Sequence, residues 1–168
     1  EKFGRATVNN TNNHIQQNNE TSHFALQSKR VVINGKTAAA CIEIKDQLIH
    51  SIHPHGKLLP CPVDDLGDLV IMPGLVDSHV HINEPGRTEW EGFNTATQAA
   101  AAGGITTLVD MPLNCIPVTT TKAAFEEKLA AVTDKLWVDC GFWGGVTPDN
   151  IEQLDELLNA GVLGVKSF

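Results

Sequence analysis

The sequence predicts an α/β protein in which a short all-β segment precedes a parallel sheet of alternating strands and helices. Short strand-like runs fill residues 29–52, whereas further apolar runs recur at residues 69–76, 105–110, 136–142 and 162–166. Helical patterns lie between these later runs. Strands that alternate with helices form βαβ units, and such units build a parallel sheet.

The all-β segment is indicated by a hairpin signal. The pair Asn34-Gly35 separates the apolar runs at 30–33 and 40–44, and Asn-Gly in this position favours a two-residue turn. A third strand is expected over residues 47–52, before a proline-rich loop. Residues 1–27 are rich in Asn, Gln, Thr and Ser, and we expect them to form a flexible leader.

Three amphipathic helices are expected later in the chain. Gly103 ends the first helix, whereas Thr147 and Pro148 begin the third, which ends at Gly161. The residues expected on the buried faces are Phe93, Ala96 and Ala100 in the first helix, Phe125, Leu129 and Val132 in the second, and Ile151, Leu154 and Leu158 in the third.

These strand–helix repeats fit either a doubly wound sheet or half of an eight-stranded barrel. A doubly wound nucleotide-binding protein has a glycine-rich loop after its first strand. Here that strand ends in Asp77-Ser78-His79-Val80-His81, which offers ligands for a cation instead of a cradle for phosphate. The barrel is therefore the better interpretation, and active sites form at the ends of barrel strands.

Composition and charge exclude several classes of partner. The formal net charge of −8 argues against nucleic acid or an anionic membrane. No apolar run is long enough to cross a bilayer. The four cysteines form no CxxC pair, which favours free thiols in a reducing compartment, such as the cytoplasm or the matrix of a peroxisome or mitochondrion. Cys115 is expected to be a small buried thiol.

His79 and His81 are the first candidate metal ligands. Side chains two residues apart on a strand share a face, so both imidazoles can reach one ion. Asp77 could ligate the metal, orient a histidine or form a turn. We do not expect metal binding by the remaining histidines of the leader and the β segment, which are His14, His23, His50, His53 and His55.

Lys166 is the third candidate ligand. It lies at the expected end of the fourth strand, within an apolar stretch, and burial disfavours the charged ammonium form. A neutral lysine amine can take up carbon dioxide to form a carbamate. Two-metal sites hold their ions roughly 3.5–4 Å apart, a span that one such group can bridge. The alternative is a surface lysine at a strand end.

Three motifs together resemble the cyclic amidohydrolases, the family that includes dihydroorotases, hydantoinases and allantoinases. The motifs are residues 73–86 around the two histidines, 102–112 in the second strand and 164–168 around Lys166. This resemblance covers about residues 29–168 and implies a (β/α)8 TIM barrel beside a small β-sandwich assembled from both chain ends. Residues 28–69 are then expected to form part of the sandwich, and residues 70–168 the first half of the barrel.

The resemblance also implies a mechanism. Two divalent cations, expected to be zinc, would be held by His79, His81 and carbamylated Lys166, and they would activate water and polarise the amide carbonyl. The acid/base aspartate and two further histidine ligands are expected beyond Phe168. The chain is thus expected to be an N-terminal fragment, inactive by itself, of an enzyme that forms homo-tetramers.

Within the family, the closest resemblance is to allantoinases, which open allantoin to allantoate in purine catabolism. Dihydroorotases carry an arginine two residues after the second histidine, whereas Asn83 stands here and cannot pair with a carboxylate as a cation does. Residues 84–93 and 141–145 also resemble allantoinases. Asn114 is expected either to contact the substrate or to cap its own loop. The alternatives are a hydantoinase or dihydropyrimidinase, a dihydroorotase, and a non-enzymatic amidohydrolase-like scaffold protein.

Overall fold

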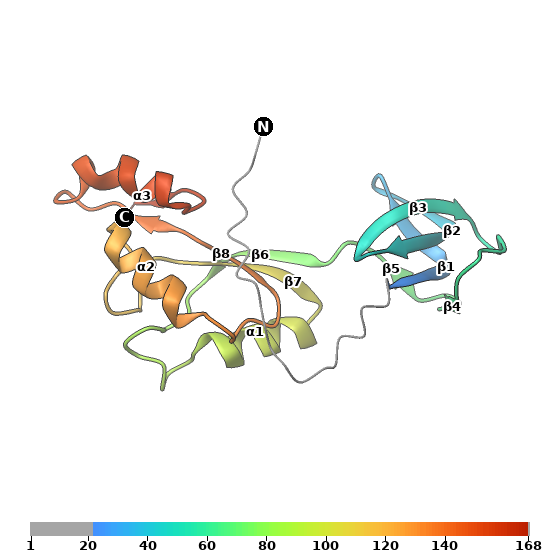
Figure 1. Cartoon of the computed structure of the whole chain (residues 1–168), viewed down its shortest axis with the longest axis horizontal. Coiled ribbons are helices and arrows are strands. Elements are labelled where there is room, and N and C mark those ends of the chain that lie inside the picture. Colours follow the sequence, from blue (N-terminus) through green and yellow to red (C-terminus); the bar gives the residue numbers. More distant parts are fainter. Residues whose placement is uncertain (1–21, 168) are drawn as a thin grey trace. The chain divides into compact units, whose positions relative to one another are not determined.

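The computed structural model describes residues 22–167, which form two compact units divided between Pro73 and Gly74 (Figure 1). Most of the expected leader, residues 1–21, and Phe168 lie outside the described residues. The mixed α/β composition predicted from the sequence is confirmed. The four cysteines are free, as predicted, and Cys115 is buried.

The first unit is a single sheet in the strand order β3-β2-β1-β4, with β5 also paired to β1. The hairpins β1–β2 and β2–β3 are antiparallel, whereas β4 and β5 run parallel to β1. The strands are β1 (His23–Ile33), β2 (Lys36–Lys45), β3 (Leu48–Pro54), β4 (Val63–Asp65) and β5 (Val70–Ile71).

The predicted hairpin turn at Asn34-Gly35 is confirmed. Both residues have positive φ, 50° and 73°, as the two central residues of a type I′ turn require. The turn between β2 and β3 also has positive φ at both positions, 52° at Asp46 and 65° at Gln47. Residues other than glycine adopt a positive φ only at a cost in conformational energy, so the second hairpin depends on the pairing of its strands.

The predicted leader, residues 1–27, extends too far along the chain, because β1 already begins at His23. Residues 23–27 are not a leader but the first half of β1, in register with β2 through pairs such as Ala25 with Glu43. The polar composition of this stretch obscured the strand, although Ala25 is fully buried. Backbone hydrogen bonds to β2 and β4 on either side outweigh the weak apolar signal of the side chains.

The predicted strand over residues 69–76 was wrong, because it joins two separate strands. Val70 and Ile71 pair with β1, whereas Leu75–Val80 form β6 in the second unit. Pro73 has no N–H for a ladder hydrogen bond, and a Cβ on Gly74 would lie 2.1 Å from the side chain of Thr106. The chain therefore leaves one sheet and enters another at this dipeptide.

The second unit contains a parallel three-stranded sheet in the order β6-β7-β8 and a short parallel pair of β9 with β10. Its strands are β6 (Leu75–Val80), β7 (Ile105–Asp110), β8 (Asp139–Phe142), β9 (Gly144–Gly145) and β10 (Val165–Lys166). Its helices are α1 (Phe93–Ala102), α2 (Lys122–Ala131) and α3 (Leu154–Ala160), the last preceded by a 3-10 turn over Ile151–Gln153.

Helices α1 and α2 match their predicted positions. Gly103 ends α1, and Thr121 caps α2 by accepting a hydrogen bond from the Ala124 N–H at 3.1 Å. The rings of Phe93 and Phe125 meet Phe142 of β8 edge to face, with centroids 6.1 and 5.7 Å apart. Among the described residues, no helix has the length and hydropathy to span a membrane.

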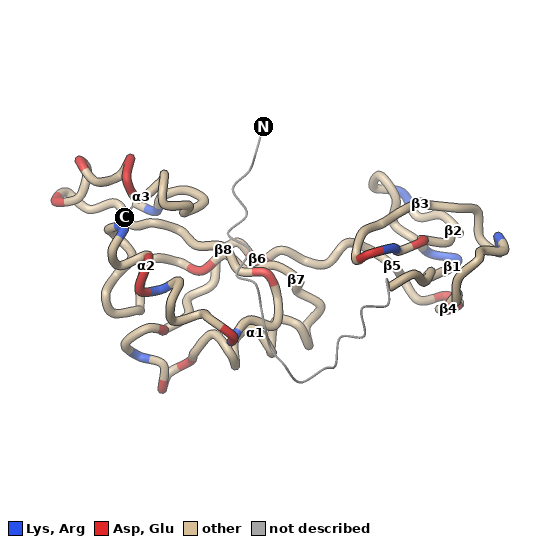
Figure 2. Tube along the Cα trace, viewed as in Figure 1, with Lys and Arg blue, Asp and Glu red and all other residues tan. Residues whose placement is uncertain are grey.

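Helix α3 differs from the prediction in its start and its buried face. Ile151 is 62% and Leu158 43% exposed, whereas Leu157 is fully buried and packs where Gly144 leaves room. The side chain of Asn150 accepts a hydrogen bond from the Thr147 N–H at 2.8 Å, which makes 147–150 a turn instead of the first helical turn. The predicted end at Gly161 is confirmed by its left-handed φ of 117°. Acidic residues occupy the outer positions of this segment (Figure 2).

A buried ion pair joins the end of β7 to α2. The Lys128 ammonium donates to Oδ2 of Asp110 at 2.5 Å, and the side chains are 1% and 0% exposed. Asp110 Oδ1 accepts a hydrogen bond from the Ile82 N–H at 2.7 Å. Burial raises the pKa of Asp110 to about 6, although the charge of Lys128 opposes this rise. One carboxylate therefore fixes β7, α2 and the loop after β6.

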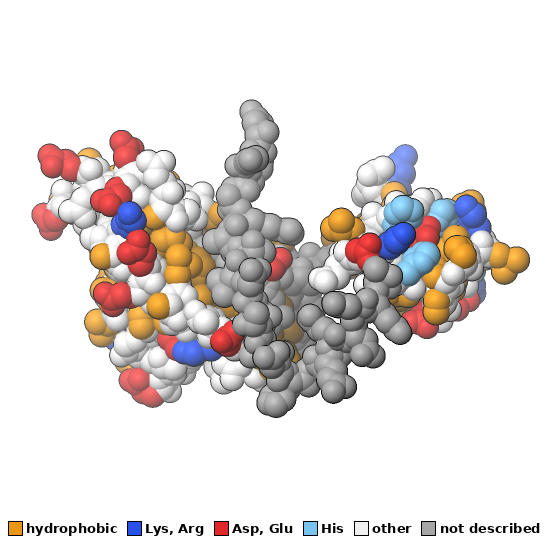
Figure 3. All heavy atoms as spheres, viewed as in Figure 1, with side chains coloured by type: hydrophobic (Ala, Val, Ile, Leu, Met, Phe, Trp, Pro, Cys, Tyr) orange, Lys and Arg blue, Asp and Glu red, His pale blue; other side chains and the backbone are white. Residues whose placement is uncertain are grey.

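A second carboxylate, Glu43, organises one face of the small sheet, where histidine side chains gather (Figure 3). Its Oε1 lies 2.8 Å from His23 Nε2 and its Oε2 lies 2.7 Å from His53 Nε2. The hydrogen bonds from His53 and His23 lower the pKa of Glu43 to about 2. The carboxylate thus stays ionised at pH values where an exposed Glu is protonated.

We expect Lys128→Met to destabilise the second unit by about 3–5 kcal/mol, because Asp110 would remain as an uncompensated buried carboxylate. Denaturant unfolding measures the change. Lys122→Met, on the same helix but 45% exposed, is the matched control and should cost no more than about 0.5 kcal/mol. Equal losses in the two variants would show that the buried pair contributes nothing.

We expect the small sheet to lose stability as the pH falls from about 4.5 to about 2. Across this window unfolded Glu43 takes up a proton while folded Glu43 stays ionised, so its contribution is complete above the window and is lost within it. Unfolding midpoints at stepped pH in metal-free buffer should fall less steeply in Glu43→Gln. Glu126→Gln, which removes an exposed carboxylate, should keep the wild-type slope. Parallel slopes for wild type and Glu43→Gln would contradict this expectation.

Candidate metal centre at the strand ends

The structure brings the two predicted histidine ligands together. His79 lies in β6 and His81 follows that strand directly. Their ring centroids are 5.3 Å apart and the ring planes are inclined by 44°. Both side chains are exposed, so their nitrogens are accessible to an ion or a small molecule.

The strand is irregular where it carries His79. Asp77 pairs with Leu108 and Val80 pairs with Asp110. The chain therefore advances three residues along β6 while it advances two along β7. Such an extra residue is a β-bulge, which redirects side chains and is frequent beside active sites. The predicted alternation of His79 and His81 on a regular strand is therefore modified by the bulge.

Two side chains satisfy the backbone of the bulge. Asp77 Oδ1 accepts a hydrogen bond from the His79 N–H at 3.0 Å, and the indole Nε1–H of Trp143 donates to the carbonyl of Ser78 at 3.0 Å. Of the three roles expected for Asp77, this contact is the turn-forming one, because its carboxylate accepts from the backbone N–H two residues further on. Sequence analysis did not single out Trp143 for this contact.

The chain is fixed again just after His81. Ile82 is fully buried, and its backbone N–H donates the hydrogen bond that Asp110 Oδ1 accepts. The two histidines thus lie between the bulge and this anchor, each of which limits the movement of the backbone. Asp110 could not be identified from sequence, because its partners are 28 and 18 residues away.

Lys166 lies in β10, which pairs with β9, and it is half-buried. Its carbonyl accepts a hydrogen bond from the Val146 N–H at 2.8 Å. Partial burial lowers the pKa of His81, and the charges of His79 and Lys166 lower it further. Lys166 is thus close enough to His81 to act on its charge. A neutral imidazole is the form that binds a metal, so the lowered pKa of His81 fits a ligand role for this residue.

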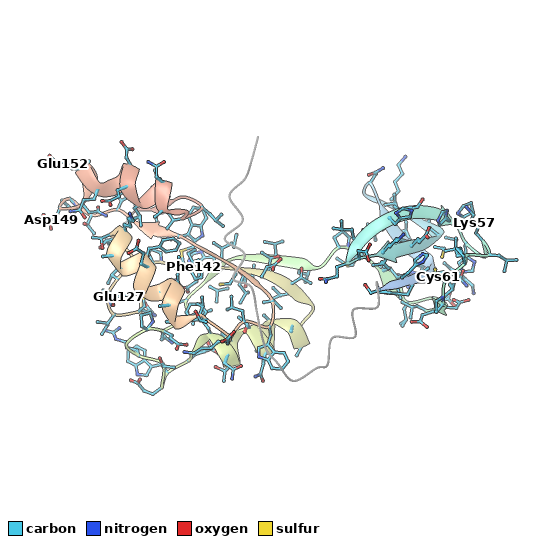
Figure 4. All side chains as sticks on the ribbon, in the orientation of Figure 1. Lys57, Cys61, Glu127, Phe142, Asp149 and Glu152 are labelled. Atoms are coloured by element: carbon cyan, nitrogen blue, oxygen red, sulfur yellow. The ribbon has the colours of Figure 1, made fainter. Side chains whose placement is uncertain are left out.

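Trp143 also contacts the segment that leads to Lys166. A Cβ on Gly164 would lie 2.6 Å from the Trp143 ring, so only glycine allows this approach. Trp143 directly follows Phe142, which is labelled in Figure 4 at the end of β8. One aromatic side chain therefore contacts both the histidine strand and the lysine segment.

The predicted substrate residue Asn83 is buried, with 9% of its surface exposed. Its Oδ1 has no hydrogen-bond partner among the described residues, although its backbone N–H donates to the Glu91 carbonyl at 3.1 Å. A buried acceptor without a donor costs roughly 1–3 kcal/mol. A ligand that supplies an N–H or O–H group would recover this cost.

Asn114 is exposed in the loop after β7 and has a left-handed φ of 68°, which Asn adopts more readily than most residues. Its role with substrate stays a prediction. The same loop meets the loop after β6, where the Ile116 N–H donates to the Pro85 carbonyl at 2.8 Å.

Glu84 is a structural residue that the sequence did not reveal. It is 4% exposed, and its Oε2 accepts a hydrogen bond from the Phe93 N–H at 2.9 Å in the first turn of α1. Its other oxygen is paired with Lys135. A carboxylate at a helix N-terminus satisfies an unpaired N–H and is favoured by the helix dipole.

Known proteins with similar sequences are amidohydrolases. Residues 70–165 match the model of the amidohydrolase family. A probable allantoinase from Oryza sativa subsp. japonica is 56% identical over 152 residues, which cover 87% of this chain and 30% of the relative. An allantoinase from Streptomyces avermitilis is 52% identical over 147 residues, which cover 86% of this chain and 33% of the relative.

The solved structures that superpose on this chain include hydantoinases. An L-hydantoinase from Arthrobacter aurescens superposes with a TM-score of 0.78 at 33% identity, over 86% of this chain and 32% of that protein. A D-hydantoinase superposes with a TM-score of 0.71 at 27% identity, over the same shares. The chain therefore spans about a third of the length of the relatives it matches. Since the family match covers more than half of its residues, the chain belongs to the amidohydrolase family.

Proposed function

We propose that this chain carries the first metal-binding residues of an enzyme that hydrolyses the cyclic amide of allantoin to allantoate. The observation that carries the proposal is the His79–His81 pair at the end of β6, whose ring centroids lie 5.3 Å apart. The relatives named allantoinases, at 52–56% identity, support the choice of substrate.

We also propose the finer architecture. Parallel β6, β7 and β8 alternate with helices, which suits the first half of a (β/α)8 barrel, and residues 28–69 suit part of a small β-sandwich. The barrel half would cover residues 70–168, except that Val70 and Ile71 pair with the small sheet. We propose in addition that the whole enzyme forms a homo-tetramer and is located in a reducing compartment.

His79, His81 and Lys166, the last as a carbamate, would hold divalent cations, for which zinc is the proposed identity. Such cations supply an activated water molecule near neutral pH and polarise the scissile carbonyl. The chain's own residues hold and orient these ligands. Asp77 and Trp143 fix the bulge at His79, and Asp110 fixes the backbone after His81.

The proposed substrate contacts are Asn83 and Asn114. Allantoin is a neutral ureide rich in N–H groups, and a buried carbonyl oxygen such as Asn83 Oδ1 accepts from a group of that kind. A carboxylate substrate such as dihydroorotate would place its carboxylate oxygens, which only accept hydrogen bonds, against the Asn83 Oδ1 acceptor. Asn83 therefore favours the neutral ring.

Two other functions are weaker candidates. A hydantoinase or dihydropyrimidinase is supported by the solved neighbours, but at 33% identity or less among those compared. A metal-free scaffold protein would have no need for His79, His81 and Lys166, and the bulge supported by Asp77 and Trp143 would serve no purpose there.

We expect the whole enzyme that contains this chain to hydrolyse allantoin with a higher kcat/KM than dihydroorotate or unsubstituted hydantoin. The physical reason is the Oδ1 acceptor of Asn83, which has no hydrogen-bond partner among the described residues and would face the carboxylate of dihydroorotate. Steady-state kinetics on the three substrates provide the measurement. A preference for dihydroorotate would overturn the assignment.

We expect Lys166→Ala in the whole enzyme to lower kcat by at least about 100-fold, since even indirect support of a metal ligand contributes about 10- to 100-fold. Short carboxylic acids should partly restore activity, because a small carboxylate can replace the bridging carbamate. Lys122→Ala, with an exposed lysine, is the control and should retain activity. Unchanged metal content and turnover in Lys166→Ala would show that Lys166 is only structural.

A further inference from the structure

A second group of side chains with metal-ligating atoms lies in the small sheet, and it shares no residue with the proposed catalytic site. His23 comes from β1, Glu43 from β2, and Cys61 from the segment entering β4; Cys61 is labelled in Figure 4. One ligand atom from each residue lies within 4.8 Å of those of the other two. The sequence-based prediction had excluded His23 from metal binding by assigning it to a leader.

The strand register explains why the three meet. Ala25 pairs with Glu43 on one side and with Val63 on the other. Because alternate residues share a face, His23, two residues before Ala25 on β1, lies on the face of Glu43. Cys61 precedes β4 by two residues, and the pairing of Val63 with Ala25 brings this segment beside β1, where its thiol lies within 4.8 Å of the ligand atoms of His23 and Glu43. Ala25 is fully buried on this face, and its small side chain leaves room for the larger groups around it.

The donor set is one that zinc accepts. Imidazole nitrogen, thiolate sulfur and carboxylate oxygen bind zinc at about 2.0–2.3 Å, so two ligands of a tetrahedral ion lie about 3.5 Å apart. Separations within 4.8 Å need only small side-chain adjustments to reach that value. We propose that His23, Glu43 and Cys61 form a structural zinc site in the small sheet.

The surroundings of Glu43 support this proposal. His53 Nε2 holds Oε2 of Glu43 at 2.7 Å, and the Lys57 ammonium donates to His53 Nδ1 at 3.1 Å. Partners that orient a ligand in this way are typical of metal sites. They leave Oε1, the oxygen beside His23, to face the ion. His53 is thus a positioning residue, and the zinc replaces the hydrogen bond between His23 and Glu43.

Zinc binding here is a ligand exchange without redox chemistry. The Cys61 thiol gives up its proton to solvent as the sulfur–zinc bond forms, and His23 gives up a second proton where it was imidazolium. Water can supply the fourth ligand. The site ties β1, β2 and the entry to β4 together. Two histidine–carboxylate hydrogen bonds alone would explain His23 and His53 but would not need a thiol beside them.

Cobalt substitution of the whole protein tests the site. Cobalt bound by a thiolate gives a sulfur-to-metal charge-transfer band in the near ultraviolet, and the His79–His81–Lys166 site contains no cysteine. We expect wild type to show the band and Cys61→Ser to lose it together with one zinc ion per chain by elemental analysis. His23→Gln should weaken the band. Cys140→Ser, a half-buried thiol in β8, is the matched control and should keep both band and zinc.

Wild-type protein without the band, or a band and zinc content that survive Cys61→Ser, would overturn the proposal. Circular dichroism establishes whether each variant is folded. Should Cys61→Ser fail to fold, His23→Gln and chelator titration of the wild-type band decide the question. Allantoin hydrolysis measured in the same samples distinguishes this site from the catalytic one, since either result can fail without the other.

Discussion

The carboxylate of Asp110 is the group on which the arrangement of the second unit depends. Asp110 is the last residue of β7. Its carboxylate accepts one hydrogen bond from the backbone N–H of Ile82, just after the histidine strand, and another from the Lys128 ammonium of α2. A buried charge is costly, and only hydrogen bonds to both oxygens together with an opposite charge offset this cost. Few alternative arrangements satisfy all of these partners. The position of the backbone after His81 is therefore set by electrostatics as much as by packing.

The histidine strand shows how a site can be exposed and still be held in place. His79 and His81 reach solvent, but the backbone on either side of them has fixed partners in Asp77, Trp143 and Asp110. Trp143 also packs against Gly164, two residues before Lys166, so one side chain contacts both the histidine strand and the lysine segment. The two imidazoles need few contacts of their own, because the groups that bond to the backbone around them limit its movement.

The sequence predicted the features that depend on local patterns. The Asn34-Gly35 turn, α1 with its end at Gly103, and β7 all follow from residues within a few positions of one another. The bulge before His81 and the roles of Asp110 and Glu84 were not predictable, because their partners lie up to 51 residues away. The strand beginning at His23 was missed because its stability comes from pairing with β2, and the chain's polar composition there carries little signal.

In the proposed enzyme, the Oδ1 of Asn83, which has no partner among the described residues, would give a physical basis for substrate selection. Protein folding normally satisfies buried acceptors, and one that stays unsatisfied lowers stability unless a ligand completes it. A site with a buried acceptor binds a molecule that brings a donor and rejects one that brings a carboxylate, since the second leaves two acceptors facing each other. Discrimination of this kind is stronger than discrimination by shape alone. In the proposed enzyme, Asn83 would therefore select among related cyclic amides by their charge and hydrogen-bonding groups, while cations held by the histidines would polarise the amide bond that all of them share.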